Sequence, residues 1–168
     1  NKLTKISLPD SLIEIGRSAF NSCAALTEIQ IGGQTRIIGE KAFLECTRLQ
    51  TVHMSDAVTS IGPEAFSKCN ALKTITLSNN LVEIGNYAFN GCVSLETIQI
   101  PHKATTIGAS AFYNCTSLKN ITIPNTITGI GGYTFSDCTS LTSIMISDSV
   151  TRIGNRAFEG CRSLTSVV

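Results

Sequence analysis

The chain has 168 residues and a formal net charge of +1, from 13 basic and 12 acidic residues spread along its length. This balance leaves no basic surface for a phosphate backbone, so we expect no nucleic-acid binding. The longest apolar runs are only a few residues, too short to cross a bilayer, so we expect no membrane insertion.

A 23-residue unit repeats along the whole chain without insertion or deletion. Such a fixed period is typical of a solenoid, and it predicts one array over residues 1–168 with about seven coils. The clearest columns are Cys23, Cys46, Cys69, Cys92, Cys115, Cys138 and Cys161, then Phe20, Phe43, Phe66, Phe89, Phe112, Phe135 and Phe158, then Gly16, Gly39, Gly62, Gly85, Gly108, Gly131 and Gly154.

Each unit begins with a short alternating pattern, L-x-x-I-x-I, as at Leu26, Ile29 and Ile31. Alternation of apolar and polar residues predicts a half-buried strand. No single unit can bury its apolar side alone, so the coils must stack. We therefore predict one parallel sheet on the concave face, with a strand from each unit and a spacing of about 4.8 Å.

A turn follows each strand, as at Pro101-His102, and then a second short apolar pair ends on the repeated glycine. Proline preselects turn dihedral angles, which supports the turn assignment. A glycine at the same point of every unit indicates either a positive φ or a close approach between coils.

The last part of the unit reads G-x-x-A-F-x-x-C, as at Gly85, Ala88, Phe89 and Cys92. Apolar residues three, four and seven positions past the glycine have helical spacing. We predict one or two turns of α or 3₁₀ helix here, which makes the fold class an α/β leucine-rich-repeat solenoid. The return from helix to strand is expected to be right-handed.

The phenylalanine and cysteine columns are expected to lie in the core. Adjacent coils would allow a disulfide by distance, but side chains in one column point the same way. The count of cysteines is odd, and one per unit matches no zinc pattern. We interpret the cysteines as buried reduced thiols in preference to disulfides or a metal site.

The complete pattern L-x-x-I-x-I-P-x-x-V-x-x-I-G-x-x-A-F-x-x-C-x-S resembles the leucine-rich repeat of the BspA-like family, found on the surface of host-associated bacteria and parasitic protists. Only Thr134 departs from the alanine of this pattern. Thr35 and Ala104 replace a larger apolar residue, which predicts weaker coils at those points.

The resemblance implies a secreted or cell-surface protein, and an adhesin that binds host matrix or plasma proteins such as fibronectin or fibrinogen. The alternative is a structural spacer that projects another domain and binds nothing itself. In either case the array is expected to continue beyond both ends. Without capping units at Asn1 and Val168, apolar coil edges would favour end-to-end self-association.

Strand alternation places two outward side chains per unit on the predicted sheet. These are poor in charge and rich in threonine, which suits an exposed sheet and equally a broad protein-binding surface. The candidate protein-binding residues are Glu28, Gln30, Thr51, His53, Thr74, Thr76, Thr97, Gln99, Asn120, Thr122, Ser143 and Met145.

Nothing in the pattern indicates catalysis. His53 falls on an exposed strand position and His102 in a turn of a different unit, so they are not expected to share a proton or a ligand. No phosphate loop or nucleophile motif occurs. We therefore expect no enzyme activity, no metal and no cofactor in this array.

Overall fold

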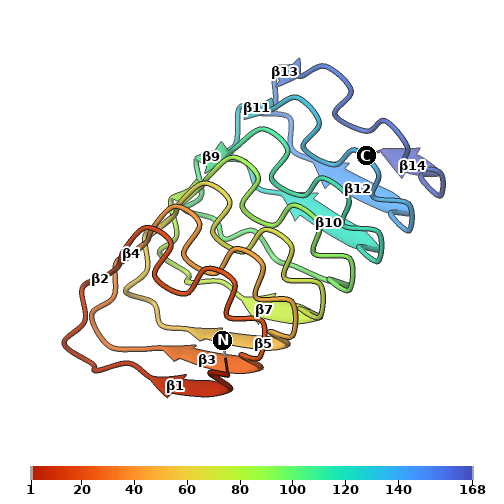
Figure 1. The fold of residues 1–168 in the computed structure, drawn as a ribbon. Helices are drawn as coiled ribbons and strands as arrows, with labels where there is room; N and C mark the ends of the chain where they lie inside the picture. Colours follow the sequence, from red (N-terminus) through yellow and green to blue (C-terminus); the bar gives the residue numbers. More distant parts are fainter. Residues whose placement is uncertain (1, 168) are drawn as a thin grey trace.

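The computed structural model describes residues 2–167, which form a stack of coils that advances by one 23-residue unit at a time (Figure 1). We number the coils from the leucine that opens each unit. Coil 1 begins at Leu3, coil 4 at Leu72, coil 5 at Leu95 and coil 6 at Leu118. The predicted solenoid is confirmed.

The first strand of each unit lies along one side of the stack, and neighbouring strands pair in parallel. Their register follows the repeat, as in the pairing of Ile29 with Val52. This layer contains β1 Lys5–Ser7, β3 Glu28–Ile31, β5 Thr51–Met54, β7 Thr74–Thr76, β10 Asn120–Ile123, β12 Ser143–Ile146 and β14 Ser166–Val167.

The second strand of each unit lies on the opposite side and is only two residues long, ending just before the repeated glycine. These strands also pair in parallel between neighbouring coils. They are β2 Glu14–Ile15, β4 Ile37–Ile38, β6 Ser60–Ile61, β8 Glu83–Ile84, β9 Thr106–Ile107, β11 Gly129–Ile130 and β13 Arg152–Ile153.

The predicted helical turns are wrong, because the described residues contain no helix. In the G-x-x-A-F-x-x-C segment of coil 4, Tyr87 and Gly91 have φ of 58° and 70°, and these left-handed residues interrupt any helix. The equivalent two positions have positive φ in every coil. The fold is therefore a β-solenoid, and the α/β assignment is corrected.

The hydrogen bonds of this segment explain how helical spacing arises without a helix. Alternate N–H groups bond within the coil and to the next coil. The Phe89 N–H donates to the Ala111 carbonyl of coil 5 (2.8 Å), whereas the Asn90 N–H donates to the Tyr87 carbonyl of its own coil (3.0 Å). In a helix the N–H groups would bond to carbonyls of the same segment, so they would not be available to bond to the next coil.

The phenylalanines form the continuous centre of the stack, as predicted. Successive rings lie 5.2–5.6 Å apart between centroids and within 11° of parallel. From Phe43 to Phe135 they have no exposed surface, whereas Phe20 and Phe158 are half-buried. Centroid separations of this size are typical of offset stacking.

The cysteines are free thiols, and all except the half-buried Cys161 are buried, which confirms the interpretation as reduced core residues. Each thiol from coil 2 onward also donates a hydrogen bond to the carbonyl of the phenylalanine in the preceding coil, as from Cys92 Sγ to Phe66 O (3.2 Å). Burial raises the pKa of Cys92 to about 12. A neutral thiol is thus both a packing group and a weak donor between coils.

The repeated glycine is required by the close approach of coils, the second of the two predicted reasons. It has no positive φ in any coil. A Cβ placed on Gly85 would lie 2.6 Å from the Pro63 nitrogen and 2.7 Å from the Gly62 carbonyl carbon of the preceding coil. Gly16 lies in coil 1, which has no complete described coil before it. A Cβ placed on Gly16 would therefore meet no atom within 4 Å.

We expect Gly85→Ala to destabilise the array by about 1 to 3 kcal/mol, because the new methyl group must push two backbones apart. Chemical denaturation measures the loss. Gly16→Ala is the matched control, with the same chemistry in the open space of coil 1 and an expected change below about 0.5 kcal/mol. Equal losses in the two variants would contradict the close-approach explanation.

Among residues 2–167 there is no helix at all, and hence no long apolar helix of the kind that crosses a membrane.

Candidate protein-binding face

The twelve candidate residues lie on one side of the stack, on the layer of longer strands. We call this set the strand face. Ten of the side chains are exposed, and Thr51 and Ser143 are half-buried. Their inward neighbours are buried apolar residues such as Ile75 and Ile121, so the predicted alternation of the strands is confirmed.

The register aligns these side chains in two columns. In the first column Glu28 pairs with Thr51 and Thr51 with Thr74. In the second, Gln30 pairs with His53, and the His53 Nε2 lies 3.6 Å from a carboxylate oxygen of Glu28. This contact is between exposed side chains, so it contributes little to stability.

The second half of the face has no charged candidate residue. Thr122 pairs with Met145 and Asn120 with Ser143. The Ser143 hydroxyl donates to the Asn120 Oδ1 (2.9 Å). Met145 is 58% exposed, which is unusual for a large apolar side chain and gives this end of the face an adaptable apolar contact.

The sheet is interrupted at coil 5, which differs from the prediction of one strand per unit. The strands order as β1-β3-β5-β7 and as β10-β12-β14. Coil 5 contributes isolated bridges from Thr97 to Thr74 and Asn120. Backbone hydrogen bonds at Glu96 also join it to both neighbours: the Glu96 N–H donates to the Lys73 carbonyl (3.1 Å), and the Lys119 N–H donates to the Glu96 carbonyl (3.2 Å). Residues 98–100 form no strand, and Gln99 has no strand partner within residues 2–167.

Two prolines lie at the strand ends beside the interruption. In coil 3 the Ser55 N–H donates to the Ile31 carbonyl and adds a rung at the end of the ladder (3.0 Å). The equivalent residues are Pro101 in coil 5 and Pro124 in coil 6. Proline has no N–H and cannot form this bond. Ser78 and Ser147 do not form it either, and their strands still pair, so the prolines do not by themselves explain the break.

Coil 5 is also less well joined on the other side of the stack. The short-strand ladder runs from β2 to β9 and resumes only at β11. The weaker coil predicted at Ala104 stays a prediction, and the break in this ladder lies next to it, between coils 5 and 6. The weaker coil predicted at Thr35 also stays a prediction. The Thr35 hydroxyl donates to the Leu12 carbonyl of the preceding coil (3.0 Å), and both ladders continue there.

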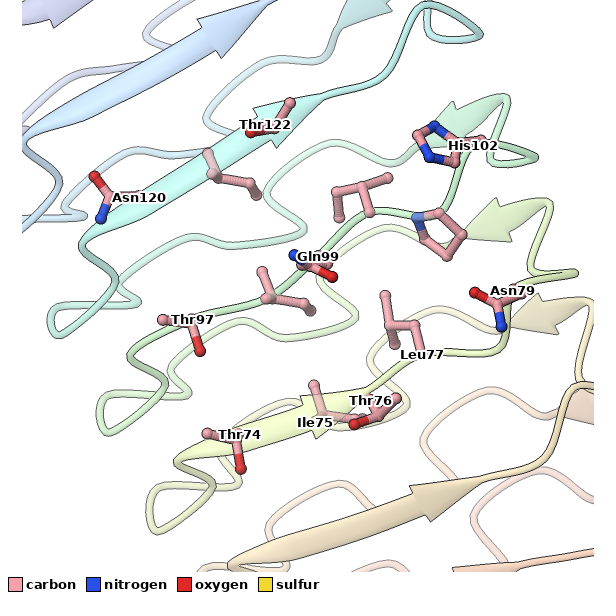
Figure 2. Close-up of a pocket in the computed structure, with 14 residues that line it drawn as sticks. Thr74, Ile75, Thr76, Leu77, Asn79, Thr97, Gln99, His102, Asn120 and Thr122 are labelled. Carbon is pink, nitrogen blue, oxygen red and sulfur yellow. The ribbon is translucent and has the colours of Figure 1, made fainter.

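A hollow of about 650 Å³ lies over the interruption (Figure 2). Its lining contains no acidic residue, no lysine and no arginine. Threonine, asparagine, glutamine and histidine side chains surround a floor of isoleucine and leucine. The polar lining residues are Thr74, Thr76, Asn79, Thr97, Gln99, His102, Asn120 and Thr122.

Most of these polar groups are available to a ligand. Threonines elsewhere use their hydroxyls within the stack, as Thr142 does toward the Lys119 carbonyl (3.2 Å). By contrast, within the described part of the chain, side-chain hydrogen bonds are absent at Thr74, Thr76, Thr97, Gln99 and Thr122.

Sequence reasoning placed six of these eight residues on the face and did not include Asn79 and His102. Both follow the strand and enter the hollow because the chain turns there (Figure 2). The turn dipeptides Ser78-Asn79 and Pro101-His102 were the available signal, since each directly follows a predicted strand.

The two histidines of the sequence lie in different units. His53 lies on β5 and His102 in the turn of coil 5, so the structure does not bring them together. Within residues 2–167 no cluster of three or more histidine, cysteine, aspartate or glutamate side chains could hold a metal ion.

The parallel ladders, the stacked phenylalanines and the 23-residue period define a leucine-rich-repeat solenoid. The profile of the BspA type leucine rich repeat region matches residues 1–119 and 82–168, in six copies. The chain belongs to this family.

Solved bacterial structures share the fold. The chain is 27% identical to a leucine-rich repeat protein from T. pallidum, with a TM-score of 0.91, over 98% of this chain and 79% of that one. It is 37% identical to a leucine-rich repeat protein from Bacteroides ovatus, with a TM-score of 0.89, over 94% of this chain and 41% of that one.

A third structure is a leucine rich cell surface protein from Faecalibacterium prausnitzii, 28% identical with a TM-score of 0.62, over 98% of this chain and 60% of that one. The chain spans less than half the length of the Bacteroides ovatus protein and about three fifths of the Faecalibacterium prausnitzii one. Among curated proteins, none matches this chain.

Proposed function

We propose that this array is a protein-interaction module of a secreted or cell-surface protein, and that the strand face binds the partner. Solenoids of this kind present extended surfaces to macromolecules. The cell-surface description of the Faecalibacterium prausnitzii relative supports the location. Host matrix or plasma proteins, with fibronectin and fibrinogen first, are the partners to test.

The observation that carries this proposal is the set of exposed polar side chains without partners on the strand face between β7 and β10. A sheet that served only as a spacer would gain stability if these hydroxyls bonded across strands. Because the lining is uncharged, we expect binding to depend weakly on salt, unlike contacts between charged surfaces.

Lysine substitution of Thr74, Thr76, Thr97 and Gln99 together tests the face. We expect at least about a tenfold loss of affinity for the bound protein, because four charges would have to be desolvated at the contact. Surface plasmon resonance with immobilised fibronectin and fibrinogen gives the affinities, and thermal unfolding confirms that the variant is folded.

The matched control places four lysines on the opposite side, at Val82, Glu83, Thr106 and Thr128, which are all exposed. Their effect on affinity is expected to be small. Unchanged binding of the strand-face variant would show that the face is not the site. If the intact parent protein binds its partner equally well with and without the four strand-face lysines, the result would support the spacer function instead.

A further inference from the structure

We propose that three tyrosines on one flank of the stack form a docking surface for a proline-rich segment in the polyproline II conformation. Tyr87, Tyr113 and Tyr133, called the tyrosine surface below, lie in the G-x-x-A-F-x-x-C segments of coils 4, 5 and 6. These segments connect the two strand layers, so the tyrosine surface lies apart from the strand face (Figure 1). The inference goes beyond the proposed function, because it concerns a second surface and a different partner chemistry.

The tyrosine surface gathers the exposed aromatic side chains of the array. The chain has three tyrosines and no tryptophan, and its seven phenylalanines form the central column. Tyr87 is 45% exposed and Tyr133 is 37% exposed, whereas Tyr113 is half-buried. Single exposed apolar residues are ordinary, but a cluster over three successive coils is typical of an interaction surface.

The backbone gives no structural reason for a tyrosine at the two exposed positions. Tyr87 and Tyr133 occupy the same position of the repeat and have φ of 58° and 56°. This position has a positive φ in every coil, and the other coils carry serine, lysine, glutamate or arginine there. A large side chain is uncommon in this conformation, and an exposed ring gains little from burial in return. Unfavourable positions of this kind are often retained where they serve binding.

The exposed rings stand as ridges across the flank. The Arg156 guanidinium carbon of coil 7 lies over the Tyr133 ring, 5.7 Å from its centroid, so this ring turns its face along the stack. Tyr87 has the same backbone conformation two coils earlier, and we assign it the same orientation. Between them coil 5 carries the small residue Ser110, which is buried and forms the floor. Upright aromatic side chains with a gap between them suit proline rings, whereas a sugar ring stacks on an aromatic face turned outward.

The separation of the two ridges agrees with the repeat of a polyproline II helix. In the adjoining core column the ring centroids advance by 5.5 Å from Phe89 to Phe112 and by 5.5 Å again to Phe135. With a strand spacing of about 4.8 Å per coil, equivalent atoms of Tyr87 and Tyr133 are separated by about 10 to 11 Å. A polyproline II helix advances about 9.3 Å in one turn of three residues, so residues one turn apart can contact both ridges.

The hydrogen-bonding groups of the surface also match this ligand. A proline-rich segment in this conformation has no internal hydrogen bonds and few N–H groups, so it presents mainly carbonyl acceptors. Within residues 2–167 the hydroxyls of Tyr87 and Tyr133 and the side-chain amide of Asn90 have no protein partner. The charge of Asp137 and a hydrogen bond to it raise the pKa of Tyr113, which directs this hydroxyl toward coil 6. Phenol and amide groups can donate to the carbonyls of the segment.

Ion pairs occupy the same flank in the earlier coils and limit the surface to coils 4 to 6. Lys41 Nζ lies 3.3 Å from a Glu64 carboxylate oxygen, and Lys68 Nζ lies 2.8 Å from one of Glu45. Charged side chains that pair with each other leave no uncovered aromatic ring for a proline to contact. The stretch from Tyr87 to Tyr133 is therefore the part of the flank that fits the segment.

The experiment titrates the intact array with a ten-residue polyproline peptide and follows the intrinsic tyrosine fluorescence. Because the chain has no tryptophan and all three tyrosines lie on the tyrosine surface, the signal reports this surface alone. We expect a saturable change. A ten-residue peptide of alternating alanine and glycine is flexible, so it should bind at least about tenfold more weakly.

Two variants test the geometry. The double variant Tyr87→Ser, Tyr133→Ser removes both ridges with the residue that coil 5 carries, and Tyr113 still reports binding. Ser110→Tyr fills the gap between the ridges. We expect each variant to lose at least about tenfold in affinity without loss of thermal stability. Lys41→Ser changes the same repeat position in coil 2 and is the matched control, with an expected change below about twofold.

No saturable change with polyproline, or equal affinity for the alanine-glycine peptide, would overturn the inference. So would unchanged binding by Ser110→Tyr, or a saturable change with cellohexaose in the absence of polyproline binding. The proposed function fails separately, because it is judged by fibronectin and fibrinogen binding of the four-lysine variant of the strand face. That variant should bind polyproline as the unsubstituted protein does, and a loss there would place the peptide on the strand face and overturn the inference.

Discussion

Phe89→Ala is expected to lower the free energy of unfolding by about 3 to 5 kcal/mol. The Phe89 side chain is fully buried, and its ring lies 5.5 Å from both Phe66 and Phe112 between centroids. Truncation therefore removes ring contacts on two sides and leaves a cavity in the middle of the stack. The coils above and below cannot collapse into it, since their backbones are held by hydrogen bonds between coils.

The substitution should also weaken the coupling between the coils before and after Phe89, because each unit of a solenoid contacts only its neighbours. Denaturation followed by circular dichroism measures the loss, and amide exchange shows whether coils 4 and 5 open first. Phe158→Ala is the matched control. Phe158 is half-buried and has a described ring on one side, Phe135, so its loss should be smaller. A loss well below about 1 kcal/mol at Phe89 would remove this residue from the core.

Alkaline pH is expected to destabilise the array steeply. Burial holds the pKa of Cys92 at about 12, compared with 9.0 for a solvent-exposed thiol, and raises the pKa of Cys69 and Cys115 as well. The folded state therefore retains these protons where the unfolded state has lost them. Stability is fully present below pH 9 and falls as the pH rises toward the folded-state pKa.

The slope is about 1.4 kcal/mol per pH unit for each such thiol, so these three together give about 4 kcal/mol per unit. Urea denaturation at pH 8 to 11 under reducing conditions measures it. Cys92→Ser isolates the effect of thiol ionisation, because serine keeps a donor for the Phe66 carbonyl but does not ionise in this pH range. It should reduce the slope by about 1.4 kcal/mol per pH unit. An unchanged slope would mean that Cys92 is not buried as a neutral thiol.

The G-x-x-A-F-x-x-C segment shows where sequence periodicity was ambiguous. Its apolar residues are all inside, as expected, but they are placed there by consecutive turns and not by a helix. Residues with positive φ such as Tyr87 carry no sequence signal for that conformation, since glycine or asparagine would be the usual choice. Bonding to the next coil imposes it.

The candidate face was largely predictable, because alternation in each L-x-x-I-x-I pattern decides which side chains point outward. The hollow at coil 5 was not. Coil 5 has the same apolar pattern, Leu95, Ile98 and Ile100, as the coils with full strands, so the pattern gave no sign of the break. Only the pairing between coils shows it, because Thr97 forms isolated bridges and residues 98–100 form no strand.

The sequence by itself determined the period, the order of the columns, the buried thiols and phenylalanines, and the outward residues of the strand face. These follow from the identity of each residue and its position in the repeat, which are local properties. Only the tertiary structure decided that turns replace helices and that the sheet opens at coil 5. Both depend on where backbone N–H groups find their acceptors, and in a solenoid many of those acceptors lie in the adjacent coil.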